Sequence, residues 1–156
     1  MGTKEWEGGE DNVLGNPKNW TEGHNGVDAR PYSGPRCSVW VTAQFTGYHR
    51  WEAAPAKVGF LRDMHRHVFH VRVEVAVDHD DRDVEFFILK EAVETIIRME
   101  FAGKTDIGSC EMIARKIHTE LNRRHLHVEG DTYCVLSVMQ VDVSDDGENG
   151  ATIRTR

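Results

Sequence analysis

The chain has few cysteines: only Cys37, Cys110 and Cys134 occur among its 156 residues. Their number is odd, and their spacing matches no metal-binding or redox motif. Disulfides persist in oxidising compartments, so reduced thiols in a cytoplasm are the simplest interpretation. We therefore expect a cytoplasmic protein.

The sequence also lacks an apolar run long enough to span a bilayer and a charged-then-apolar leader, which favours a soluble, unexported protein. An excess of positive charge is missing too. The formal net charge is −7, and the basic residues are scattered. This composition argues against a protein that binds nucleic acid or a membrane surface.

Apolar periodicity is almost absent from residues 1–36, where Trp6, Val13, Leu14 and Trp20 stand isolated. This stretch predicts an irregular N-terminal arm, either partly disordered or laid across a neighbouring subunit. The remaining residues, 37–156, are long enough for one folded domain with its own core.

The most informative stretch lies in the first half of this domain. From Phe69 to Val77 apolar and polar residues alternate, which predicts a strand with one buried face. Counting back places His67 and His65 on that apolar face. A second alternating run, Ser38 to Phe45, leads to His49, the natural third member of the set.

Three neutral imidazoles suit zinc, and three protein ligands leave a position open for water or substrate. The alternative is equally simple, because a histidine on an apolar strand face is often only a hydrogen-bonded core or interface residue.

The rest of the chain predicts an α+β fold of order β-β-α-α-β-β, an antiparallel four-stranded sheet with two helices on one face. Helical spacing extends from Phe86 to about Met99, and Ser109 is the expected N-cap of a second helix that ends near Asn122. The remaining expected segments are a functional or packing loop over 50–64, a strand over 132–143, a turn over 145–150 and a strand over 151–155.

Several motifs resemble the 6-pyruvoyl-tetrahydropterin and 6-carboxy-tetrahydropterin synthase family, over about residues 38–155. Phe-x-x-x-His at 45–49 precedes His-x-His at 65–67, and Gly-Ser-Cys-Glu-Met-Ile-Ala at 108–114 is similar to the family's Pro-Thr-Ser-Glu-x-x-Ala. Residues 82–90 and 141–145 continue the resemblance. It implies a tunnelling-fold unit that assembles into a homo-oligomeric barrel, and a zinc ion on His49, His65 and His67.

The same resemblance implies that Glu111, Asp145 and Ser109 bind a pterin or related purine-type ligand. Three departures from the family's pattern matter. Leu61 stands where the family has a catalytic Cys, and the family's Asp-His pair has no counterpart between Thr95 and Gly108. Asp145 replaces a Glu, so its carboxylate is one methylene shorter.

Each of these residues also has a simpler interpretation. Asp63 is the best-placed carboxylate for acid–base catalysis, but it also fits a partner that orients a histidine, or a solvated loop residue. Glu111 suits a first helical turn, and Asp145 suits the start of an Asp-Gly turn. Cys110 fits either a thiol of lowered pKa at a helix start or a small buried residue.

Two functions of different class follow. The first is a zinc-dependent enzyme that acts on a pterin or purine-derived substrate, including a nucleotide triphosphate, by lyase or aldolase-like chemistry. The second is a non-catalytic, zinc-containing pterin- or nucleotide-binding module that has lost the proton relay. The intact three-histidine set favours the enzyme, and the missing Cys, Asp and His favour the module.

Overall fold

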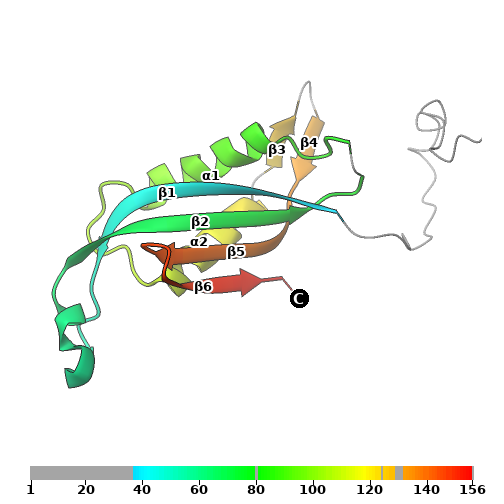
Figure 1. The fold of residues 1–156 in the computed structure, drawn as a ribbon. Helices are drawn as coiled ribbons and strands as arrows, with labels where there is room; N and C mark the ends of the chain where they lie inside the picture. The colour runs from blue at the N-terminus through cyan, green and yellow to red at the C-terminus, as the bar shows by residue number, and fades with distance from the viewer. Residues whose placement is uncertain (1–36, 80, 124, 129–131, 156) are drawn as a thin grey trace, which may run out of the picture. The chain divides into compact units, whose positions relative to one another are not determined.

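The computed structural model describes residues 37–79, 81–123, 125–128 and 132–155, so the expected arm, 1–36, lies outside the described residues. Two helices and six strands, with one 3₁₀ segment, make up this part of the chain (Figure 1). In chain order they are β1 (Ser38–His49), η2 (Ala56–Arg62), β2 (His65–Ala76), α1 (Phe86–Glu100), α2 (Cys110–Arg123), β3 (His125–Val128), β4 (Thr132–Val135), β5 (Ser137–Asp145) and β6 (Asn149–Arg154).

The main sheet has the order β1-β2-β5-β6, and all of its neighbouring strands are antiparallel. The longest ladder joins β1 to β2, from Ser38 opposite Ala76 to His49 opposite His65. With the two helices between the strand pairs, this sheet confirms the predicted β-β-α-α-β-β order and the α+β class.

One predicted strand is wrong. The run 132–143 forms two strands in different sheets: β4 pairs with β3 in a separate hairpin, and β5 joins the main sheet. Leu136, buried between the two, belongs to neither. The run is apolar on both faces at its start, so its alternation does not mark the point where the pairing partner changes. The predicted loop 50–64 likewise contains η2.

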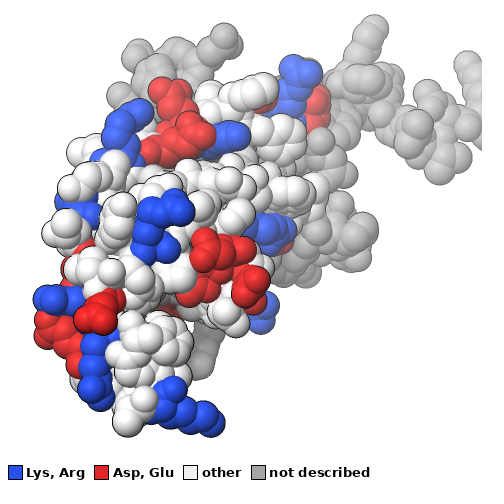
Figure 2. Space-filling view, turned by 60° about the vertical axis from the view of Figure 1, so that its left-hand side comes forward, with Lys and Arg blue, Asp and Glu red and all other residues white. Residues whose placement is uncertain are grey.

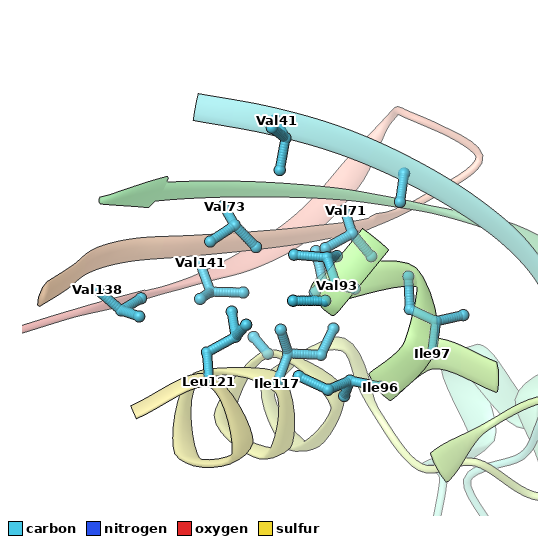
Figure 3. Close-up of a cluster of buried hydrophobic side chains, with 14 of the residues drawn as sticks. Val41, Val71, Val73, Val93, Ile96, Ile97, Ile117, Leu121, Val138 and Val141 are labelled. Atoms are coloured by element: carbon cyan, nitrogen blue, oxygen red, sulfur yellow. The ribbon is translucent and has the colours of Figure 1, made fainter. Parts of the chain in front are cut away.

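The helices pack on one face of the sheet, with α1 against β1 and α2 against β5 and β6. Valines of the strands interdigitate there with isoleucines and leucines of the helices (Figure 3). Among the described residues no polar or charged side chain is buried in this core. The fully buried side chains include Leu89, Ile96, Ile113, Ile117, Leu121, Val73 and Val141.

The opposite face of the sheet is polar, as the alternation predicts. Arg72 forms ion pairs with Glu74 at 2.8 Å and Asp142 at 3.5 Å, and its guanidinium lies 5.0 Å from the Trp40 ring centroid. Figure 2 shows another aspect of the surface, where acidic and basic side chains are interspersed. Within the described residues no helix has the length and apolar character needed to cross a membrane.

Candidate metal centre

The three candidate ligands lie at one end of the β1–β2 ladder. His49 ends β1, and His65 and His67 begin β2. His49 pairs directly with His65 in the register, and His67 pairs with Gly47. Side chains at alternate positions of a strand point to the same face, and these three share the face of the buried Phe69. They therefore lie on the helix side of the sheet, as the alternation predicts.

Close packing beneath the histidines explains the glycine at position 47. A Cβ there would collide with Cδ1 of Ile107 and lie 3.1 Å from the Phe69 ring. That ring stacks on Phe45 at 5.3 Å between centroids, and it meets the His49 ring edge-on at 5.5 Å. The His49 and His67 rings therefore pack against Phe69.

The imidazole rings surround a common point. Their centroids are 4.6 Å apart for His49 and His65, 5.0 Å for His49 and His67, and 5.1 Å for His65 and His67. The interplanar angles are 66°, 87° and 86°. One ring nitrogen from each residue lies within 4.8 Å of the others.

Each Nδ1 atom faces an oxygen that can only accept a hydrogen bond. His49 Nδ1 lies 3.1 Å from the Gly108 carbonyl, and His65 Nδ1 lies 2.7 Å from the Asp63 carbonyl. His67 Nδ1 lies 2.6 Å from Oδ2 of Asp146. A carbonyl or a carboxylate cannot donate, so Nδ1 carries a proton in all three rings, and in the neutral imidazole the lone pair then lies on Nε2.

This arrangement fits a metal ion. Ligating histidines generally donate their other ring N–H to a carbonyl or a carboxylate, as here. His65 Nε2 is buried and has no hydrogen-bond partner, which is costly for a polar atom unless a ligand completes it. The three ring nitrogens, all within 4.8 Å of one another, would hold one zinc ion and leave a position open for water or substrate.

Electrostatics also favour the neutral imidazole that metals require. Burial lowers the pKa of His49 below its usual value, and the neighbouring His65 and His67 lower it further. The hydrogen bond to the Gly108 carbonyl and the charge of Asp145 act in the opposite direction. The net shift keeps the His49 ring unprotonated near neutral pH.

Asp63, the expected acid–base group, contacts the centre through its backbone. Its carbonyl oxygen accepts the His65 Nδ1–H bond, and its side chain is exposed. The orienting role therefore belongs to the main chain, and any residue at position 63 supplies the same carbonyl.

Asp145 lies at the end of β5, opposite Phe69 in the register. Its Oδ1 atom is buried and lacks a hydrogen-bond partner, and its charge acts on both His49 and Cys110. Burial raises the pKa of the Cys110 thiol to about 11, with smaller contributions from Asp145 and Glu111. Of the two interpretations of Cys110, the small buried residue is therefore the one the structure supports.

Ser109 and Glu111 lie where α2 begins, next to the Gly108 carbonyl that binds His49. The Ser109 carbonyl accepts the first helical bond, from the Ile113 N–H. Its hydroxyl donates to the Glu111 carboxylate, which lowers the pKa of that group. Both side chains are exposed beside the centre.

Asp146 is a contributor that the sequence did not reveal. It occupies the Asp-Gly turn after β5, which was predicted only as a turn. Its carboxylate pKa is lowered by the hydrogen bond from the Val68 N–H and next by the one from His67. Because Phe69 pairs with Asp145, residue 146 lies near His67. This proximity can be predicted only once the register of β2 with β5 is known.

Comparison with known proteins supports the fold. No protein-family model and no curated protein matches the sequence. Among solved structures, the chain is similar to 6-pyruvoyl tetrahydropterin synthase from Caenorhabditis elegans, with a TM-score of 0.55 over 78% of this chain and 97% of that one. The sequence identity is 14%, so the likeness is one of fold. It agrees with the predicted tunnelling-fold unit.

Proposed function

We propose that this chain is a divergent, zinc-dependent relative of the 6-pyruvoyl- and 6-carboxy-tetrahydropterin synthases, and that it acts on a pterin or a related purine-derived substrate. The observation that carries the proposal is the set of three imidazoles whose Nδ1 atoms are all hydrogen-bonded and which each offer a ring nitrogen within 4.8 Å of the others. The similar fold supports it.

His49, His65 and His67 would hold the zinc. The ion would supply a Lewis acid for a carbonyl or hydroxyl group, and a water of lowered pKa, in lyase or aldolase-like chemistry. The chain's own contribution is to orient the ligands and to exclude water beneath them with Phe69 and Ile107.

Asp145 would recognise the substrate. A buried carboxylate oxygen without a partner is unfavourable by about 1–3 kcal/mol or more, and a ligand with adjacent N–H donors relieves that penalty. An aminopyrimidinone ring, as in pterins and guanine, presents such donors. Ser109 and Glu111, at the start of α2, would contact the same ligand, and Asp63 is the group that we propose for proton transfer.

A non-catalytic pterin- or nucleotide-binding module is the second candidate. It is favoured by Leu61 in place of a thiol, by the absence of histidine from residues 95–108, and by a Cys110 thiol that stays protonated at neutral pH. For either function we propose a cytoplasmic homo-oligomer.

Calorimetry on the zinc-loaded protein tests the pocket. A pterin should bind more tightly than an analogue without the 2-amino group, and Asp145→Asn should abolish the difference. Asp142→Asn is the matched control, because Asp142 lies on the open face of the same strand and bonds to Thr152. If Asp145→Asn keeps the preference for the 2-amino group, the pocket is wrongly assigned.

Turnover separates the enzyme from the module. Incubation of the zinc-loaded protein with dihydroneopterin triphosphate and related purine-derived substrates, followed by mass spectrometry, should reveal a product for the enzyme. Because the usual Cys and Asp-His pair are missing, we expect slow conversion to 6-pyruvoyl or 6-carboxy products. Tight binding of every such ligand without a product would support the module.

A further inference from the structure

Asp146 holds the β5–β6 turn against β2 through three hydrogen bonds. Its backbone N–H donates to the Val68 carbonyl at 2.9 Å, and its Oδ1 accepts the Val68 N–H at 2.9 Å. Its Oδ2 accepts the His67 Nδ1–H at 2.6 Å. One residue thus fixes both the main chain beside a candidate ligand and the ring of that ligand.

The turn explains how the carboxylate reaches His67. Asp146 has a φ of 49° and Gly147 a φ of 77°, so both central residues are in the left-handed region. Asp, Asn and Gly tolerate this conformation best, which is why Asp-Gly marks such turns. The turn alone would accept Asn. The Val68 N–H and the His67 N–H, however, meet different oxygens of Asp146, so in Asn one of them would face the NH₂ donor instead of an acceptor.

His67 differs from the other two histidines in what holds it. His49 and His65 are fixed by the backbone carbonyls of Gly108 and Asp63, which a side-chain substitution leaves in place. The Nδ1 partner of His67 is a side chain, and that carboxylate is about half exposed at 52%. Its hydrogen bond can therefore be removed without opening the core.

We propose that Asp146 is a positioning residue of the metal centre. It fixes the tautomer and the orientation of His67, and it makes the other ring nitrogen a stronger electron-pair donor to the metal. The metal affinity of the site therefore depends on Asp146. This inference rests on the proposed zinc-binding function. A carboxylate that accepts from a ligating imidazole makes that ring more basic at its other nitrogen.

Zinc affinity of Asp146→Asn, measured by competition with a chromophoric chelator, tests the inference. We expect binding about 10–100-fold weaker than in the parent. Glu148→Gln is the matched control, because Glu148 bonds to the Asp145 carbonyl through its backbone N–H and should bind zinc like the parent. Asp146→Gly gives the same test if the Asn variant folds poorly, since glycine favours a positive φ.

A second readout is the His67 tautomer in the metal-free protein, from long-range ¹H–¹⁵N correlation spectra. The parent should show the proton on Nδ1, and Asp146→Asn should show a mixture. Parent-like zinc affinity in Asp146→Asn, or an unchanged tautomer, would overturn this inference alone. A parent protein that binds no zinc would overturn the proposed function as well.

Discussion

The two halves of β2 use the same inward-facing positions for different purposes. In the second half Val71, Val73 and Val75 pack beneath the helices and are at most 2% exposed. In the first half the inward side chains are His65 and His67, which are only partly buried. The layer of helices explains this difference. An inward-facing side chain of the sheet belongs to the core only where a helix covers it, and α2 begins only at Cys110.

Phe69 marks the boundary between the halves. It is fully buried, it stacks on Phe45, and it forms T-shaped contacts with the His49 and His67 rings. The core therefore forms the floor of the candidate metal centre. Substitutions on the two sides of Phe69 should separate stability from metal binding.

The largest expected effect is on metal content. The His65→Ala/His67→Ala double variant should bind almost no zinc, whereas the parent should bind one ion per chain. Without metal, the variant and the parent should unfold at about the same denaturant midpoint. His70→Ala is the matched control, since His70 is on β2 but bonds to Gln44 on the open face. Metal analysis after dialysis decides it, and full occupancy in the double variant would refute the assignment.

The next effect is on stability in the other half. Val73→Ala removes two buried methyl groups beneath the helices and should lower the free energy of unfolding by about 2 kcal/mol, from lost burial and the remaining cavity. Its zinc content should equal the parent's. Urea denaturation with metal analysis of the folded protein tests both parts, and lost zinc would mean that the halves are not independent.

A smaller effect is expected on the pH dependence of stability, and it tests whether Cys110 belongs to the hydrophobic core. Its native thiol pKa of about 11 exceeds the ordinary 9.0, so the unfolded thiol loses its proton first as the pH rises. Stability is therefore intact below pH 9 and falls above it, by about 1 kcal/mol at pH 10. Unfolding of the parent and Cys110→Ala at pH 8 and pH 10 isolates this contribution, and an equal loss in both would contradict it.

Residue patterns predicted the parts of the molecule that depend on local periodicity. The alternation of apolar and polar residues from Phe69 to Val77 predicted β2 and its buried face. Counting back along the same alternation placed His65 and His67 on the helix side. The helical spacing from Phe86 predicted α1 to within one residue of its end at Glu100.

Tertiary geometry decided the rest. The break at Leu136 depends on which strand β4 pairs with, and the contact of Asp146 with His67 depends on a positive φ and on the register of β2 with β5. Neither the choice of pairing partner, nor the register, nor a positive φ produces a periodic pattern in the sequence. The roles proposed for Asp63, Ser109, Glu111 and Asp145 in substrate binding and catalysis stay predictions.

X-ray absorption at the zinc edge of the zinc-loaded protein tests the central claim most directly. The account predicts three imidazole nitrogens at about 2.0–2.1 Å, completed by a light atom from water or substrate. The His65→Ala/His67→Ala protein should give no such spectrum. A sulfur ligand at about 2.3 Å, or a zinc environment that is the same in the double variant, would contradict a centre built from His49, His65 and His67.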